Sequence, residues 1–137
     1  MPLDPALVAE VRAWLSKAAK DLSTAEYELQ AEPPFCDDIV FNAQQAAEKS
    51  LKAYLSWQRI PFRKTHNLIE LGEACSQIDN SLESLLRRAA PLTEYAWKFR
   101  YPGDPEEATR QEAEDALAIA RQVADAVLNR VPVEVKP

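Results

Sequence analysis

Apolar residues recur along this sequence at spacings of three and four, and proline-containing breaks separate the periodic stretches. This spacing places side chains on one face of an α-helix, whereas a half-buried strand would alternate apolar and polar residues. Asp4 followed by Pro5 is typical of an N-cap and first helical turn, so a long amphipathic helix is predicted to begin there. Pro33 and Pro34 are predicted to end it, because consecutive prolines cannot continue the helical hydrogen-bond ladder.

A second helix is predicted from about residue 37 to residue 57, with a narrow face of small residues that lets a partner helix approach closely. Residues 58–66 break the period and form a predicted loop. Asn67, followed three residues later by Glu70, predicts a capping box at the start of a third helix that runs to Ile78.

A fourth helix is predicted over residues 82–96, with Pro91 kinking or interrupting it. The break at residues 100–105 is the clearest in the chain. Asp104, Pro105 and Glu107 then form the pattern of an N-cap, a first-turn proline and a capping-box glutamate, so the last helix is predicted from there to about Asn129.

These segments predict an all-α fold, an antiparallel up-and-down helical bundle of about five helices in which one helix is minor. The chain has 137 residues and only two glycines. Its length suits one domain over residues 1–137, and so few glycines leave few of the turns that hairpin sheets require. The tail, residues 131–137, is expected either to fray or to pack on a neighbouring element.

The charge is unevenly distributed. The net charge of −6 argues against a protein that binds nucleic acid over its whole surface. Yet residues 49–69 contain no Asp or Glu, and their basic residues are Lys49, Lys52, Arg59, Arg63 and Lys64, followed later by Arg87, Arg88, Lys98 and Arg100. These side chains are either ordinary solvated charges or a local anion-binding surface.

Other features predict a cytoplasmic protein without a metal or cofactor. The sequence has no apolar run of the roughly 20 residues that a membrane helix needs and no signal-peptide pattern. Cys36 and Cys75 lack further ligands at metal spacing and are predicted to be small buried thiols. The sequence also lacks a phosphate loop and a His-Glu-x-x-His motif.

Three motifs in this order resemble the HEPN family. They are Asn42-Ala-Gln-Gln-Ala-Ala-Glu-Lys-Ser-Leu-Lys-Ala-Tyr-Leu on the second helix, Lys64-Thr-His-Asn-Leu-Ile-Glu-Leu at the third, and Arg100-Tyr-Pro-Gly-Asp before the last. The resemblance implies a helical bundle that forms a homodimer with a polar cleft near the dimer interface. It also implies a partnership with a minimal nucleotidyltransferase, often as a toxin–antitoxin pair. Some members are metal-independent RNases, and others only bind nucleotides or proteins.

The resemblance implies that an RNase member carries an Arg followed after four to six residues by a His, near the start of the last long helix. The guanidinium can stabilise a phosphorane-like transition state and the imidazole can move the proton of a 2′-hydroxyl. Here Arg100 stands at the matching position, but no His follows it. His66 is the chain's one histidine, and Arg59 precedes it at formally suitable spacing, but both lie away from that motif. His66 is expected to cap the third helix, to form a hydrogen bond across the bundle, or to bind a ligand.

The candidate ligands for a nucleotide or RNA are seven residues: Lys49, Lys52, Arg63, Lys64, His66, Arg100 and Tyr101. Aromatic residues beside several of these cations could stack on a base, although they equally suit the core or a protein interface. Arg100 and Tyr101 are expected beside the N-terminus of the last helix, where free N–H groups favour anions. The alternative is that Arg100 pairs with a nearby carboxylate and that Tyr101 packs at the corner.

The preferred hypothesis is a nucleotide- or RNA-associated binding protein, homodimeric, that partners a minimal nucleotidyltransferase in a toxin–antitoxin or stress module. One alternative is an RNase toxin that uses Arg100 with Tyr101, or with His66 brought close by folding. A second alternative is a module that binds only proteins.

Overall fold

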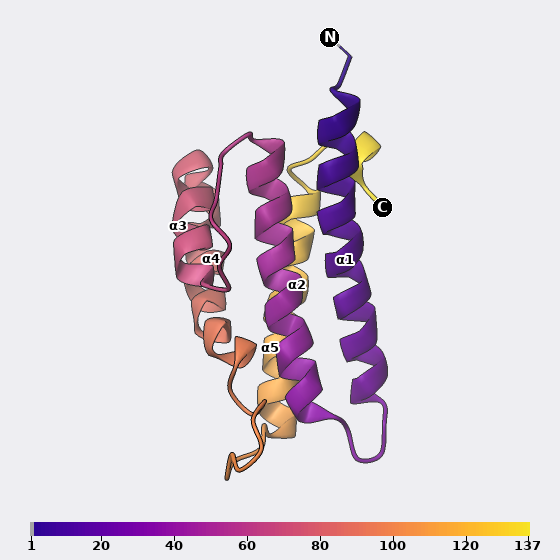
Figure 1. The fold of residues 1–137 in the computed structure, drawn as a ribbon, viewed down its shortest axis with the longest axis vertical. Coiled ribbons are helices and arrows are strands. Elements are labelled where there is room, and N and C mark those ends of the chain that lie inside the picture. Colours follow the sequence, from indigo (N-terminus) through magenta and orange to yellow (C-terminus); the bar gives the residue numbers. More distant parts are fainter. Residues whose placement is uncertain (1) are drawn as a thin grey trace.

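The computed structural model describes residues 2–137, which form a helical bundle without a β-strand (Figure 1). The α-helices are α1 (Pro5–Leu29), α2 (Cys36–Trp57), α3 (Leu68–Ile78), α4 (Glu83–Ala89) and α5 (Arg110–Leu128). Three short 3₁₀ helices are η1 (Asn80–Leu82), η2 (Ala90–Ala96) and η3 (Val133–Val135). The predicted all-α bundle of about five helices is therefore confirmed. The 3₁₀ segment that contains Pro91 replaces the last part of the predicted fourth helix, which is the interruption that the proline predicts.

Helix α2 is the centre of the bundle. It packs against α1 and α5 along its length, while α3 and η2 cover a further side and α4 packs against α3 and α5 (Figure 1). Its buried residues include Ala43, Ala46, Ala47 and Ala53, all fully inaccessible to solvent. Small side chains at these positions let the neighbouring helices approach the α2 backbone, as the narrow face in the sequence predicts.

The predicted caps at Asp4 and Asn67 are present, but the capping box at Asn67 is not. The Asp4 carboxylate accepts a hydrogen bond from the Ala6 N–H, and the Asn67 side chain accepts from the first N–H groups of α3. The Asn67 N–H donates to Thr65 Oγ1 at 3.0 Å. The prediction was wrong about Glu70, because its carboxylate binds the Arg63 guanidinium instead of reaching back to the cap.

The last helix begins later than predicted, at Arg110. Thr109 is its N-cap and forms a capping box with Glu112. Asp104 is occupied elsewhere, because its carboxylate accepts the Phe99 N–H at 3.0 Å and closes a turn in which Phe99 has a φ of 67°. The Ala108 N–H donates to the Asp37 carboxylate at the start of α2 at 2.8 Å, which holds the segment before α5 against the bundle.

The C-terminal tail, residues 131–137, packs on a neighbouring element, which is one of the two expected outcomes. Val135 in η3 is fully buried, and η3 lies against α1. The Arg12 side chain of α1 donates a hydrogen bond to the Glu134 carbonyl, which fixes the tail from the side of α1.

The two cysteines are free thiols in different environments. Cys75 is fully buried, and burial raises the pKa of its thiol to about 12, so it acts as a small apolar residue. Cys36 is only partly buried at the start of α2, contrary to the predicted burial. Separately, none of the helices formed by residues 2–137 combines the length and apolar character that crossing a membrane requires.

The corrected start of α5 can be tested by two substitutions. Thr109→Ala removes the cap that accepts the Glu112 N–H, so we expect the free energy of unfolding to fall by about 1 kcal/mol. Glu107→Ala serves as the control, because Glu107 is exposed and precedes the helix, and it should change stability by less than about 0.5 kcal/mol. Urea unfolding followed by circular dichroism measures both. A larger effect from Glu107→Ala would contradict the assigned helix start.

Candidate anion-binding site

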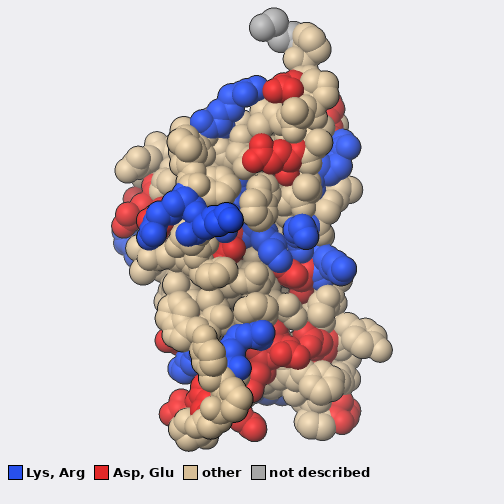
Figure 2. Space-filling view, viewed as in Figure 1, with Lys and Arg blue, Asp and Glu red and all other residues tan. Residues whose placement is uncertain are grey.

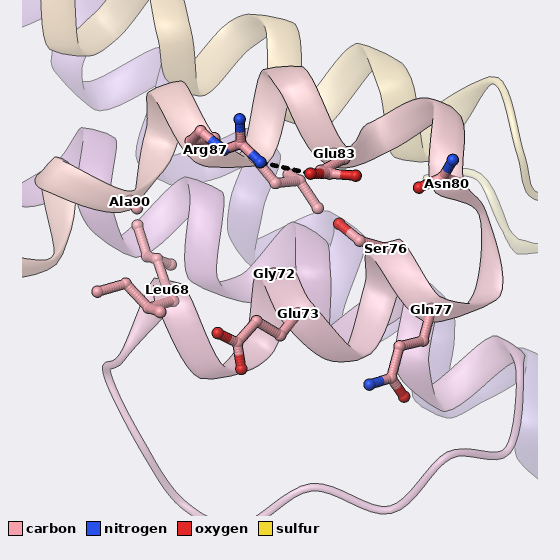
Figure 3. A pocket seen from close by; sticks show the side chains of 11 residues that line it. Leu68, Gly72, Glu73, Ser76, Gln77, Asn80, Glu83, Arg87 and Ala90 are labelled. Atoms are coloured by element: carbon pink, nitrogen blue, oxygen red, sulfur yellow. Dashed lines mark hydrogen bonds and ion pairs between the residues drawn. The ribbon is translucent and has the colours of Figure 1, made fainter.

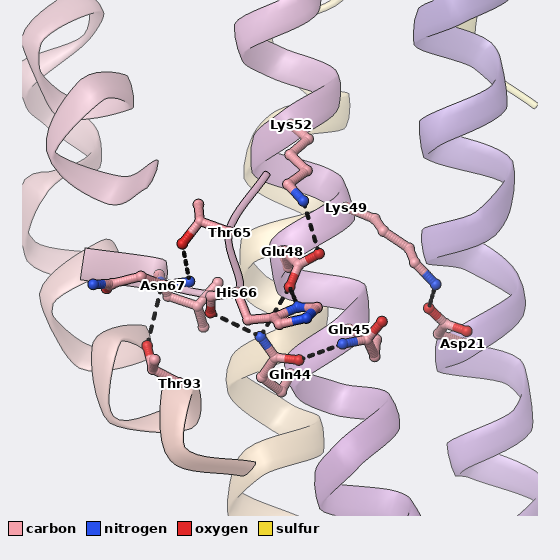
Figure 4. A network of polar contacts seen from close by, with 11 residues as sticks. Asp21, Gln44, Gln45, Glu48, Lys49, Lys52, Thr65, His66, Asn67 and Thr93 are labelled. Atoms are coloured by element: carbon pink, nitrogen blue, oxygen red, sulfur yellow. Dashed lines mark hydrogen bonds and ion pairs between the residues drawn. The ribbon is translucent and has the colours of Figure 1, made fainter. Parts of the chain in front are cut away.

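Three polar residues of α2 are buried beneath the loop that joins α2 to α3. Gln44, Glu48 and Lys52 are spaced four residues apart, so they lie on one face of the helix. Their exposed fractions are 0%, 4% and 7%. Loop residues 58–67 cover this face (Figure 4). Burial of charged and amide groups requires that each find a partner, and the loop and helix together supply them.

Glu48 is the centre of this network. One carboxylate oxygen, Oε1, lies 2.7 Å from His66 Nδ1 and accepts a hydrogen bond from Gln44 Nε2 at 3.2 Å. The other, Oε2, accepts from Lys52 Nζ at 3.0 Å. Gln44 Nε2 also donates to the His66 carbonyl at 3.1 Å, and Gln45 Nε2 donates to Gln44 Oε1 at 2.7 Å. The network therefore fastens the loop to α2 through both the side chain and the backbone of His66.

His66 forms its hydrogen bond across the bundle and does not cap α3, which Asn67 does. An ionised carboxylate can only accept, so Nδ1 carries the hydrogen in this contact. The side chain of His66 is 65% exposed. A histidine that is held through one nitrogen by a buried carboxylate presents its other nitrogen in a defined orientation.

A pocket of about 610 Å³ lies between α1 and the loop, next to this network. Its lining includes three basic residues, Lys52, Arg59 and Lys64, together with Glu10, Trp14 and Phe62. Lys52 Nζ is 5.5 Å from the centroid of the Trp14 ring, within the range of a cation–π contact. Trp14 and Phe62 meet edge to face, with centroids 6.3 Å apart. The pocket thus combines positive charge with aromatic surface.

The structure separates the seven predicted ligands into groups. Lys52 and Lys64 line the pocket, and His66 lies on the neighbouring network. Lys49 is paired with Asp21 of α1 at 2.6 Å, and Arg63 is paired with Glu70 of α3 at 2.8 Å. Figure 2 shows basic side chains with some acidic ones among them in the middle and upper parts of the molecule, and a larger run of acidic side chains toward its lower end.

Arg100 and Tyr101 do not line the pocket, and their place beside the N-terminus of α5 stays a prediction. The Arg100 guanidinium stacks on the Phe41 ring of α2, 3.6 Å from its centroid, and no carboxylate within residues 2–137 forms an ion pair with it. Tyr101 is 70% exposed instead of packed. Phe41 and Glu48 are two turns apart on one face of α2, about 10.5 Å along its axis.

The sequence alone did not identify Trp14, Glu10 and Glu48 as parts of this site. Trp14 fits the apolar period of α1 and gave no separate signal. Glu48 did give one, because it is an acidic residue between Ala47 and Leu51, two residues of the apolar face of α2. A charge in such a position indicates a buried polar contact.

Two other hollows differ in chemistry from the basic pocket. A groove of about 700 Å³ between α3 and α4 has an apolar floor, and its rim carries Glu73 and the ion pair of Glu83 with Arg87 (Figure 3). A hollow of about 610 Å³ at the α1–α2 turn has Asp37, Asp38, Glu107 and Arg110 in its lining. In the part of the chain that the structure describes, no group of three or more His, Cys, Asp or Glu residues is arranged to hold a metal ion.

Residues 11–131 of the sequence match the HEPN domain family. The chain belongs to the HEPN family. Two solved structures have similar folds: ST0689, an archaeal HEPN homologue, and TT1696 from Thermus thermophilus. ST0689 is 23% identical, with a TM-score of 0.71 over 90% of this chain and 98% of its own. TT1696 is 27% identical, with a TM-score of 0.73 over 89% of this chain and 98% of its own. No curated protein matches the sequence.

The match covers all of the polar network and most of the pocket lining. The HEPN motifs on α2 and at the start of α3 supply Glu48 and His66, respectively. In this HEPN protein the two motifs therefore meet in two hydrogen bonds, one from the His66 ring to Glu48 and one from Gln44 to the His66 carbonyl.

The importance of Glu48 for stability can be measured. Glu48→Ala leaves the buried Lys52 ammonium without its carboxylate, so we expect a loss of about 3 kcal/mol in the free energy of unfolding. Glu114→Ala breaks an exposed pair with Arg110 at the same i,i+4 spacing and should cost about 0.5 kcal/mol or less. Urea unfolding of both variants gives the comparison. Equal small losses would mean that the buried pair contributes no more than a surface pair.

Proposed function

We propose that this HEPN protein binds nucleotides, or the equivalent units of RNA, in the pocket between α1 and loop residues 58–67. The observation that carries the proposal is the meeting of Lys52, Arg59 and Lys64 with Trp14 around one hollow. Its volume of about 610 Å³ falls within the roughly 300–1,000 Å³ of small-molecule sites in general.

Each part of a nucleotide has a suitable partner in this pocket. Arg59 and Lys64 supply charge for the phosphates, and their side chains come from the loop that the Glu48 network holds in place. Trp14 offers an aromatic face for a base. Glu10 can accept hydrogen bonds from ribose hydroxyls or a base amino group, because an ionised carboxylate is an acceptor only.

The proposal extends to partners that family membership suggests. We include a homodimer and an association with a minimal nucleotidyltransferase in a toxin–antitoxin or stress module. Light scattering of the protein alone tests the homodimer, and light scattering of a mixture with a minimal nucleotidyltransferase tests the pairing. A monomeric mass, or a mixture without a complex, would remove the corresponding part.

Titration calorimetry with ADP and ATP at low salt tests nucleotide binding. We expect saturable binding that the double variant Arg59→Gln/Lys64→Gln weakens by about tenfold or more, since phosphate contacts of Arg and Lys are charge-assisted. Binding should also weaken as salt is added.

Arg121→Gln is the matched control for this titration. Arg121 forms an ion pair with Glu26, as Arg59 does with Asp4, but Glu26 lies twelve residues beyond Trp14, about 18 Å along α1. This variant should bind as the unchanged protein does. An equal loss in both variants would indicate a general charge effect, and the absence of any saturable binding would favour a module that binds only proteins.

RNA cleavage is a second candidate function, and one observation favours it. His66 is oriented by Glu48, as a general base is oriented by a carboxylate in hydrolases, and Arg100 lies above the same face of α2. The catalytic pair would then come from two loops instead of from one helix.

Incubation with single-stranded and structured RNA in the presence of EDTA separates binding from cleavage. The binding proposal expects intact RNA after long incubation. Cleavage that is lost in both Arg100→Ala and His66→Ala would establish the second candidate instead. Cleavage that survives in both variants would point to a contaminating nuclease and leave the binding proposal in place.

A further inference from the structure

Lys52 belongs to two sites at once. Its ammonium lies 3.0 Å from Glu48 Oε2 in the buried network, and its side chain also lines the basic pocket. The same ammonium is 5.5 Å from the centroid of Trp14 and 5.9 Å from that of Phe62, which are both pocket residues. A ligand phosphate and Glu48 therefore compete for one cation.

His66 contacts the other oxygen of the same carboxylate. The two carboxylate oxygens of Glu48 thus have separate partners, His66 on Oε1 and Lys52 on Oε2. Histidine is the side-chain type whose charge ordinarily changes between pH 5 and pH 8. A change of charge on His66 consequently alters how strongly Glu48 holds Lys52.

We propose that His66 is a proton-controlled positioning residue: when it gains a proton it becomes the main cation on Glu48, and Lys52 is released to bind a phosphate in the pocket. This inference rests on the proposed nucleotide binding and adds its regulation. The nucleotide is then bound more tightly at mildly acidic pH than at mildly alkaline pH.

The charge balance explains the direction. With His66 neutral, Glu48 and Lys52 cancel each other, and the pocket draws on Lys64 and on Arg59, whose guanidinium lies 3.5 Å from the exposed Asp4 carboxylate. With His66 protonated, the three groups carry a net charge of +1. The additional charge lies on the largely exposed His66 ring, but it acts through the nearly buried Glu48 carboxylate 2.7 Å away, and this contact is screened less than one between two groups at the open surface.

The other charged groups around His66 and the pocket are mostly paired among themselves. On α1, Asp21 pairs with Lys49; on α3, Glu70 pairs with Arg63; on η2, Glu94 pairs with Lys98. Glu10 of α1 accepts a hydrogen bond from Ser56 at the pocket wall. Within residues 2–137, Glu48 is the one carboxylate whose oxygen contacts the His66 ring.

Calorimetric titration with ADP at about pH 5.5 and about pH 8, on either side of the histidine range, tests the inference. The affinity for ADP should be higher at about pH 5.5 than at about pH 8. The ratio of these two affinities should be about five times larger in the unchanged protein than in His66→Gln, a coupling typical of linked sites. ADP itself also titrates in this range, but equally for every variant.

The outcomes separate the two proposals. Binding whose pH profile is the same in His66→Gln and in the unchanged protein would overturn the role of His66 and leave nucleotide binding in place. Absence of ADP binding at both pH values would overturn both. Lys52→Gln gives a second measure, because its affinity for ADP should depend on pH as weakly as that of His66→Gln. An affinity that rises at acid pH as much as in the unchanged protein would also overturn the inference. Circular dichroism at both pH values verifies that each variant is folded.

Discussion

The buried carboxylate of Glu48 is the contact on which the rest of the site depends. It lies on the central helix α2, and its partners come from the same helix and from loop residues 58–67. Without it, Lys52 would be a nearly buried ammonium with no carboxylate, and the loop would lose the contact that the His66 side chain makes with α2. The wall of the pocket that carries Arg59 and Lys64 belongs to that loop, so the buried Glu48 carboxylate supports both the ion pair with Lys52 and one wall of the basic pocket.

The fold was predictable where local signals agree with one another. Apolar spacing, proline breaks and the caps at Asp4 and Asn67 placed the first three helices within a few residues. The start of α5 was not predictable in the same way, because the sequence offers both Asp104 and Thr109 as possible N-caps. Asp104 has the stronger local pattern, but it closes the turn at Phe99, and the Asp37 carboxylate holds the following segment through Ala108. That choice depends on a contact between segments far apart in the sequence.

The candidate site was predictable only in part, because charges were visible in the sequence and their partners were not. The basic stretch does form one wall of the pocket, through Lys52, Arg59 and Lys64. Lys49, however, is paired with Asp21, 28 residues away. A count of basic residues therefore overestimates the charge available to a ligand. Trp14 was missed because it fits the apolar period of its helix, and this pattern gives no sign that an aromatic residue borders a pocket.

Arg100 and His66 are anchored at different points along α2. The His66 imidazole contacts Glu48, whereas the Arg100 guanidinium stacks on Phe41, two helical turns away along α2. A group that transfers a proton must come within hydrogen-bond distance of it. For cleavage, the two groups would therefore have to reach one phosphodiester from anchor points two helical turns apart. In an RNA strand laid along α2, Arg100 would hold an adjacent phosphate and fix the register of the strand, which is a binding role. Under the proposed binding, the basic pocket and Arg100 would serve the same extended ligand.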